Sequence, residues 1–129
     1  QYAHARVASI KRKATEMGLA LPAPGEADLG LLSEPEELAL LRNLAAYPDL
    51  IAQATQSLEP HRLTYYLTQL ASAFHAYYNR HRVLGQEPEL SRARLCLAQA
   101  VGQVVANGLG ILGVEAPERM EREPDEDGR

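Results

Sequence analysis

Apolar residues near the start of the chain recur at intervals of three and four positions, which is the spacing of one face of an α-helix. The spacing predicts a first helix from about Tyr2 to Met17, ended by Gly18. Four cations precede the first anion of this helix, Glu16. The pattern alone favours an amphipathic core helix with a basic face in solvent. The positions expected to be buried are Ala3, Val7, Ile10, Ala14 and Met17.

The next helical pattern follows a connector rich in proline and glycine, residues 18–32. Ser33 is expected to cap this helix, and Glu36 three residues later completes the sequence of a capping box. Pro48 then interrupts the pattern and begins a second short helix. The buried positions predicted for the two helices are Leu38, Leu41, Leu44, Ala45, Ile51, Ala54 and Leu58.

Two long helices are predicted in the rest of the chain. The first starts at Pro60 and should be the longest, extending to about Leu84, and Gly85 ends it. The second starts at Glu87-Pro88-Glu89. The predicted inner positions are Leu63, Leu67, Leu70, Phe74, Tyr77 and Tyr78 on the first helix and Leu90, Leu97, Val101, Val104 and Ile111 on the second. Three glycines of the second helix allow another backbone to approach closely, namely Gly102, Gly108 and Gly110.

The fold class that follows is all-α, a helical bundle of about five to six helices. No stretch of useful length alternates between apolar and polar residues as a strand would. No apolar run reaches the ~20 residues that cross a bilayer. The single cysteine, Cys96, excludes an internal disulfide framework and is expected to be a small buried hydrophobe. A cytoplasmic protein with no membrane association is therefore expected.

Charge is distributed unevenly along the chain. The formal net charge is −4, which argues weakly against an RNA partner. Residues 121–129 contain five acids and two arginines and carry −3 of this charge, which leaves −1 on the other 120 residues. Local basic clusters can therefore persist on the body of the protein. We divide the chain into a bundle, residues 1–120, and a charged tail, residues 121–129, that is expected to be disordered.

The usual signals of catalysis are missing from the sequence. It contains no glycine-rich phosphate loop and no nucleophile elbow. The four histidines are far apart and pair with no cysteine, so no metal site is predicted. A binding function is therefore favoured over an active site within these residues.

The end of the long central helix places aromatic residues beside cations, in the order Tyr77-Tyr78-Asn79-Arg80-His81-Arg82. Aromatic rings can stack on the bases of single-stranded RNA, and cations can contact its phosphates. Such rings are also ordinary residues at the edge of a core. The alternative hypothesis is a helical protein–protein adaptor or docking domain, with Tyr77 and Tyr78 as interface anchors.

Three segments together resemble the C-terminal domain of arginyl-tRNA synthetases. Gln1-Tyr2-Ala3-His4-Ala5-Arg6 is similar to a signature of that family. The stretch from Leu58 through Tyr78-Asn79 is similar to its tyrosine-bearing central helix, and Asn107 to Met120 is similar to its usual chain end. The order and spacing also match, and the resemblance covers residues 1–120.

The resemblance implies a helical bundle known as the DALR anticodon-binding domain, which holds the anticodon loop of tRNA. The Asp-Ala-Leu-Arg tetrapeptide behind that name is absent, and Pro60-His61-Arg62-Leu63 stands in its neighbourhood. Four positions carried over from the family surround the second anticodon base, namely Tyr2, Arg12, Tyr78 and Met120. Arg6, Asn79 and Arg82 are added as RNA-binding residues from the basic cluster and from their proximity in sequence.

The resemblance also implies a parent enzyme, an ATP-dependent arginine–tRNA ligase. The family's ATP-binding HIGH-like and KMSKS-like motifs are absent from these residues, so no catalytic site and no cofactor are expected here. ATP and Mg²⁺ belong to the parent. The expected partners are arginine tRNA and a catalytic domain upstream in the same chain, and a monomer is expected. The start at Gln1, inside a helical pattern, suggests a piece of a longer protein.

Overall fold

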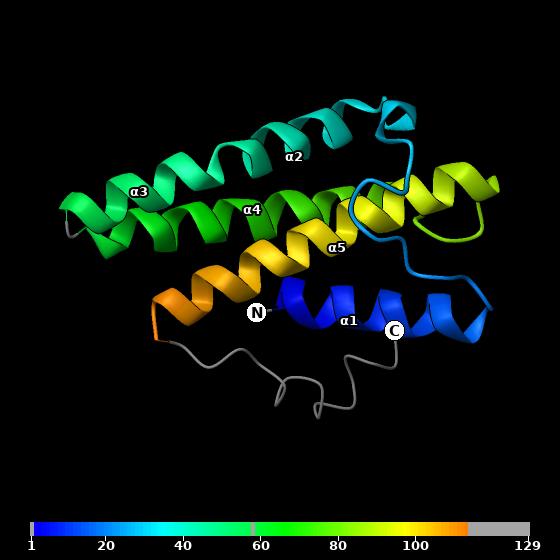
Figure 1. The fold of residues 1–129 in the computed structure, drawn as a ribbon, viewed down its shortest axis with the longest axis horizontal. Helices are drawn as coiled ribbons and strands as arrows, with labels where there is room; N and C mark the ends of the chain where they lie inside the picture. The colour runs from blue at the N-terminus through cyan, green and yellow to red at the C-terminus, as the bar shows by residue number, and fades with distance from the viewer. Residues whose placement is uncertain (1, 58, 114–129) are drawn as a thin grey trace.

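The computed structural model describes residues 2–57 and 59–113, and these residues form helices and loops without a strand. The helices are α1 (Tyr2–Glu16), α2 (Pro35–Ala45), α3 (Tyr47–Ser57), α4 (Pro60–Arg80) and α5 (Pro88–Ile111), with a short 3-10 turn, η1 (Leu29–Leu31). Only Ala46 separates α2 from α3, and the two follow one another as a nearly continuous rod along α4 (Figure 1). The all-α class is confirmed, and the described residues form five α-helices, two of which share one rod.

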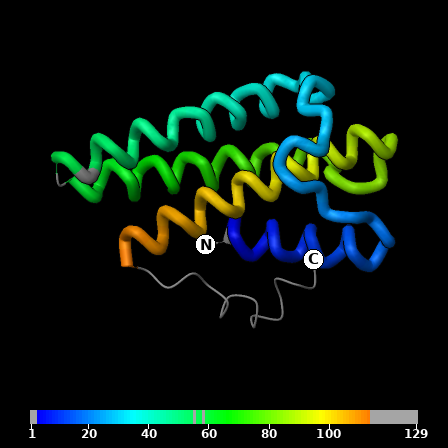
Figure 2. Tube along the Cα trace, viewed as in Figure 1, coloured from blue at the N-terminus to red at the C-terminus, as the bar shows by residue number. Residues whose placement is uncertain are grey.

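The rods form a bundle in which α4 lies between the α2–α3 rod and α1, and α5 crosses obliquely and packs on both α4 and α1 (Figure 2). One apolar core joins all of them. Its largest fully buried side chains include Tyr77 and Phe74 of α4, Leu40 of α2 and Leu95 of α5. The bundle therefore holds α1 and the end of α4 as neighbours, although about 60 residues of sequence separate them.

The first helix follows its predicted pattern. Ala3, Val7, Ile10 and Ala14 are buried, because they share the face that packs on α5. Met17 is 55% exposed and was wrongly placed in the core, since the helix ends at Glu16. Gly18 has a φ of +83° and closes the helix, with its N–H on the Thr15 carbonyl and the Leu19 N–H on the Ala14 carbonyl. This pair of bonds is the Schellman arrangement that a glycine at this position favours.

The start of α2 differs by one residue from the prediction. Glu34, not Ser33, is the cap, and Pro35 is the first helical residue. A proline restricts the residue before it to an extended conformation, and Glu34 has φ −70° and ψ 145°. The capping contact therefore shifts as well, because the Glu37 carboxylate accepts the Glu34 N–H at 3.0 Å.

The buried face of α2 also differs from the predicted stripe. Leu38 is 43% exposed and Ala45 is exposed, whereas Leu40 and Glu37 are fully buried. Positions 37, 40, 41 and 44 make a regular inward face, but its first member is a carboxylate. Apolar spacing could not reveal a face that begins with a charge.

The central helix α4 ends at Arg80, four residues earlier than predicted, and α5 with 24 residues is the longer helix. The chain turns extended at His81, whose φ is −133°. Contacts of His81 with α2 and of Arg82 with α5, described below, hold this conformation. The predicted inner positions of α4 are buried except Tyr78, which is half-buried.

Glycines on α5 let neighbouring helices approach. A Cβ at Gly102 would lie 2.8 Å from Val7 of α1, and one at Gly108 would lie 2.7 Å from Leu67 of α4. Gly110 meets nothing within 4 Å, so the prediction of a close approach is wrong there.

Other expectations for α5 also need correction. Val104 is half-buried and Ile111 is 54% exposed, while Val105 and Leu109 fill the inner positions near the end of the helix. Cys96 is a free thiol and is half-buried rather than buried.

Side chains of α5 bind the backbone of the connector before α2. Gln99 donates from Nε2 to the Pro22 carbonyl at 2.9 Å, and Arg92 donates to the Glu26 carbonyl at 3.2 Å. Leu32 is buried in the core. Met120 and the predicted tail, residues 121–129, lie outside the described residues, and no helix of the described part is long and apolar enough to cross a membrane.

Candidate nucleic-acid interface

A groove of about 620 Å³ runs between α1 and the C-terminal end of α4. One wall comes from α1 and the other from the last turn of α4 and the loop after it. The lining residues are Ser9, Ile10 and Lys13 on α1, and Tyr78, Asn79, Arg80, His81, Arg82, Val83 and Leu84 on the other side. The groove is open to solvent.

The Tyr78 ring is fixed by a cation on the neighbouring helix. The guanidinium carbon of Arg6 lies 4.5 Å from the centroid of this ring. At that distance the ring quadrupole attracts the cation, and the contact orients both side chains. Arg6 and Tyr78 are both half-buried, so each keeps part of its surface in solvent.

Cations line the groove on both walls. Lys13 of α1 and Arg80 and Arg82 of the opposite wall are exposed. Arg80 is 70% exposed even though its guanidinium lies 3.5 Å from the Glu36 carboxylate. An exposed ion pair contributes little to stability and can exchange its carboxylate for another anion. The groove therefore combines positive charge with one oriented aromatic ring.

An ion-pair cluster borders the groove at the start of α2. Nε2 of His81 lies 3.1 Å from a Glu36 carboxylate oxygen. A hydrogen bond from its own backbone N–H, the bond with His81 and the charge of Arg80 hold the pKa of Glu36 below its usual value of 4.5. Glu34, Glu36 and His81 bring ligand atoms within 4.8 Å of one another, which histidine spacing in the sequence did not reveal. Because Arg80 already lies beside Glu36, we interpret this cluster as an ion-pair network rather than a metal site.

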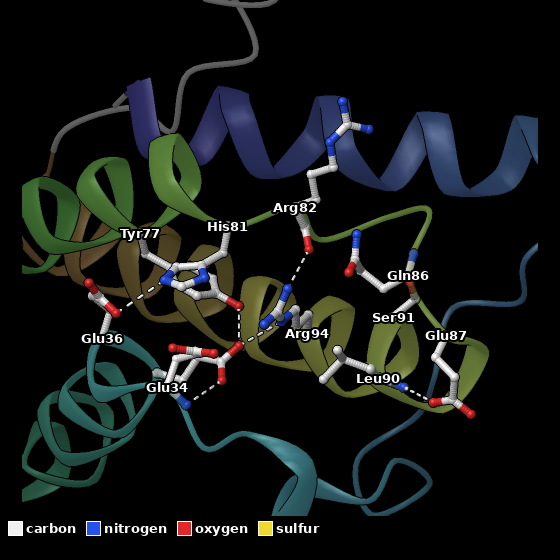
Figure 3. Close-up of polar contacts among 11 residues, drawn as sticks. Glu34, Glu36, Tyr77, His81, Arg82, Gln86, Glu87, Leu90, Ser91 and Arg94 are labelled. Atoms are coloured by element: carbon white, nitrogen blue, oxygen red, sulfur yellow. Dashed lines mark hydrogen bonds and ion pairs between the residues drawn. The ribbon is translucent and has the colours of Figure 1, made fainter.

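A buried polar network supports the wall of the groove (Figure 3). Glu37 of α2 is fully buried and accepts the Tyr77 hydroxyl at 2.6 Å and Nε of Arg94 at 2.7 Å. Arg94, on α5, also donates from Nη1 to the Arg82 carbonyl at 2.8 Å. The network joins α2, α4, α5 and the loop after α4. Burial and the hydrogen bond to Glu37 raise the pKa of Tyr77 far above its usual range, so the phenol stays protonated and donates.

The chain matches the family model described as "DALR anticodon binding domain" over residues 1–120. The chain belongs to the DALR anticodon-binding domain family. Its curated relatives include the arginine–tRNA ligases of Geobacter metallireducens and Moorella thermoacetica, with 49% and 52% identity over 120 residues. Each alignment covers 93% of this chain and 21% of the relative.

A solved structure gives the same family and fold. The arginyl-tRNA synthetase of Thermus thermophilus superposes with a TM-score of 0.76 at 36% identity, over 91% of this chain and 20% of that one. The DALR domain described here thus spans about a fifth of the length of its relatives. The resemblance to arginyl-tRNA synthetases read from the sequence is confirmed.

The predicted RNA-binding residues of this DALR domain separate into groups. Tyr78, Asn79 and Arg82 line the groove, and Arg6 touches Tyr78 from the side of α1. Tyr2 begins α1, and its side chain is outside what the structure describes, as is all of Met120. All seven residues remain predictions as RNA contacts. Four of them lie together at the groove, namely Arg6, Tyr78, Asn79 and Arg82.

Arg12 lies elsewhere on α1. Among the described residues that line the groove, α1 contributes Lys13 and not Arg12, which is exposed on the same helix. Successive residues of a helix are rotated by about 100° around its axis, so the side chains of Arg12 and Lys13 point in different directions. Lys13 points into the groove and Arg12 does not. Lys13 was not among the predicted RNA-binding residues, although its position about one turn beyond Ser9 and Ile10 places it on the same face of α1.

A second cavity of about 850 Å³ lies on the other side of α1, against α5 and the connector. Lys11, Cys96 and Gln99 are among its lining residues. His4 also lines it, and its Nδ1 is buried without a hydrogen-bond partner among the described atoms. Among the residues whose side chains are described, none of the predicted RNA-binding residues borders this cavity.

Proposed function

We propose that this chain is the anticodon-recognition domain of an arginine–tRNA ligase, binding the anticodon loop of arginine tRNA in the groove between α1 and the end of α4. The observation that carries the proposal is the Tyr78 ring, oriented by Arg6 at 4.5 Å at the edge of a groove lined by Lys13, Arg80 and Arg82. An aromatic ring beside cations suits a single-stranded loop, whose bases stack on rings and whose phosphates pair with cations.

The parent enzyme would carry out ATP-dependent arginylation in a catalytic domain upstream of Gln1. The arginine–tRNA ligases that this chain resembles are about five times longer, which leaves room for such a domain. ATP and Mg²⁺ would act there, and the role of the residues described here is to hold and orient the tRNA. Cytoplasmic location and a monomeric state belong to this proposal as well.

The alternative of a helical adaptor loses one of its two anchors. Tyr77 is fully buried and donates to Glu37, so it cannot insert into a partner protein. Three cations line the groove together with the apolar Ile10, Val83 and Leu84, and it is open to solvent, whereas interface anchors usually sit in well-packed, desolvated pockets.

The test is a titration of the chain with two RNA hairpins. One carries the anticodon loop of arginine tRNA, and the other has its second anticodon base changed from cytosine to adenine. Every arginine codon has guanine in its second position, so this cytosine is common to all arginine anticodons. We expect the altered hairpin to bind about tenfold more weakly, which corresponds to ~1.4 kcal/mol. Equal affinity for both hairpins, independent of salt, would exclude anticodon recognition.

The salt dependence of binding assigns the phosphate contacts. Replacing Lys13 with alanine should reduce the slope of log affinity against log salt by about 0.7, the value for one phosphate of a single strand. Lys11→Ala is the matched control, because Lys11 faces the second cavity on the other side of α1. Arg12→Ala tests the family-derived prediction directly: a slope reduced as much as for Lys13→Ala would show that Arg12 also reaches the RNA.

A further inference from the structure

A buried guanidinium binds the backbone of the loop after α4. Arg94 is 7% exposed and uses two different nitrogens, Nε to Glu37 at 2.7 Å and Nη1 to the Arg82 carbonyl at 2.8 Å. Glu37 is in turn fixed by the Tyr77 hydroxyl and by the Glu34 N–H at 3.0 Å. The position of the Arg82 backbone therefore depends on a chain of charged hydrogen bonds that starts inside the core.

The backbone and side chain of Arg82 face opposite surroundings. Figure 3 shows its carbonyl directed at Arg94 and its guanidinium pointing away, toward α1. Arg82 lines the groove and its side chain is exposed. Holding the carbonyl thus fixes the point from which the guanidinium reaches into the groove, although Arg94 is not among the residues lining it.

We propose that Arg94 is a positioning residue for RNA recognition, which fixes Arg82 at the rim of the groove by binding its carbonyl. Glu37 and Tyr77 act one step further back, by orienting Arg94. This proposal rests on the proposed function, since it assigns a role in binding the same RNA loop. It adds residues that the RNA never touches to the set that determines affinity.

The test variant is Arg94→Lys. A lysine keeps the positive charge beside Glu37, but its one nitrogen cannot occupy the positions of both Nε and Nη1 of Arg94. We expect the affinity for the arginine anticodon hairpin to fall by about threefold to tenfold, within the range of coupling between residues of one network. Leu67→Ala is the matched control, because it loosens the core about 16 Å away along α4 from Tyr78, at 1.5 Å per residue, and should leave the affinity unchanged.

A double-mutant cycle with Arg82→Ala separates positioning from a general loss of structure. This substitution removes the guanidinium and leaves the carbonyl in place. If Arg94 acts by placing Arg82, the Arg94→Lys effect should shrink to less than about twofold in the Arg82→Ala background. An equal fold-loss in both backgrounds, or no loss in either, would overturn the proposal.

Amide hydrogen exchange tests the same link without RNA. Exchange of the His81 amide, which donates to the Tyr77 carbonyl at 2.9 Å, should accelerate by about tenfold in Arg94→Lys and not in Leu67→Ala. Unchanged exchange would overturn the positioning role. If the unmodified chain fails to bind the hairpin, the proposed function fails, while this exchange result still decides whether Arg94 holds the loop.

A milder variant covers the case in which Arg94→Lys does not fold. Tyr77→Phe removes one donor from Glu37 and leaves the Arg94–Arg82 bond in place. As in Arg94→Lys, exchange of the His81 amide should accelerate and hairpin affinity should fall, each by about twofold. A folded Tyr77→Phe variant with neither change would contradict the proposed chain from Glu37 through Arg94 to Arg82.

Discussion

Tyrosines occupy both ends of α4, but their surroundings differ. Near Pro60, the ring of Tyr66 stacks on Tyr47 of α3 with centroids 5.6 Å apart, and its hydroxyl donates to the Asn43 carbonyl at 2.5 Å. Burial raises the pKa of Tyr66 to about 12. Near Arg80, Tyr78 lies against the guanidinium of Arg6 at the edge of an open groove.

The comparison separates a tyrosine used inside the bundle from the one that we propose binds RNA. At the Pro60 end, ring and hydroxyl are both used by other parts of the bundle, through neutral contacts. At the Arg80 end, it is the buried neighbour Tyr77 that connects α4 to the other helices, through Glu37 and Arg94. Tyr78 is thereby left partly exposed beside cations. Buried charge at one end and neutral hydrogen bonds at the other therefore predict losses of stability of different size.

The largest effect is expected from Glu37→Ala. It leaves the Arg94 guanidinium buried without its partner, and breaking a buried ion pair in this way costs about 3–5 kcal/mol of unfolding free energy. Tyr66→Phe, at the other end of α4, removes one neutral hydrogen bond and should cost only about 0.5–1.5 kcal/mol. Urea unfolding of both variants measures the difference, and equal losses would show that the two ends are held alike.

The second prediction concerns RNA affinity. Tyr78→Ala should weaken binding of the arginine anticodon hairpin by about 1–3 kcal/mol, the range for one aromatic ring stacked on a base. Tyr65→Ala is the control, since Tyr65 lies toward the Pro60 end of the same helix and is 66% exposed. Fluorescence titration of folded variants gives both values. An unchanged affinity for Tyr78→Ala would remove the ring from the binding site.

The third prediction tests how α1 is held against the bundle. A Cβ at position 102 would meet Val7 at 2.8 Å, and the branched valine has little freedom to move away. Overpacking outweighs the gain in helix propensity, so Gly102→Ala should lose about 0.5–2 kcal/mol of unfolding free energy.

Gly110→Ala is the matched control for this substitution. The space beside Gly110 is open, so the same change should gain about 0.5–1 kcal/mol there. Thermal unfolding of the two variants compares them. A stabilised Gly102→Ala would mean that α1 can shift away from α5, and the groove with it.

The smallest effect is a pH dependence at the groove end. The pKa of Glu36 lies below its usual 4.5 in the folded chain, so its contribution to stability is present above that pH and is lost as the pH falls through the lowered folded value. Glu36→Gln should therefore differ from the unmodified chain in Tm at about pH 6 and converge with it toward about pH 3.

Asp49→Asn, at the start of α3, is the control for removing one carboxylate. A Glu36→Gln difference that stays constant with pH would show that the ion pairs with His81 and Arg80 do not stabilise the fold.

Much of this protein could be predicted from local sequence alone. The interval of apolar residues gave the helices and the all-α class, and Gly18 gave the end of α1. Tyr78 and the cations after it indicated the end of α4 at which we propose that RNA binds. These features depend on contacts within one or two turns, such as the positive φ at Gly18, or on a helical period that is written in the order of residues.

Tertiary structure alone decided which charges lie inside and where α4 stops. Glu37 and Arg94 lie on the inward faces of their helices, each three residues before a buried leucine, Leu40 and Leu97. They are stable there because each is the other's partner, 57 residues away in the sequence. Their pairing also places Arg82 at the groove. No periodicity of one helix can encode such a match, because a buried charge is tolerated only where a second helix brings the opposite charge to hydrogen-bonding distance.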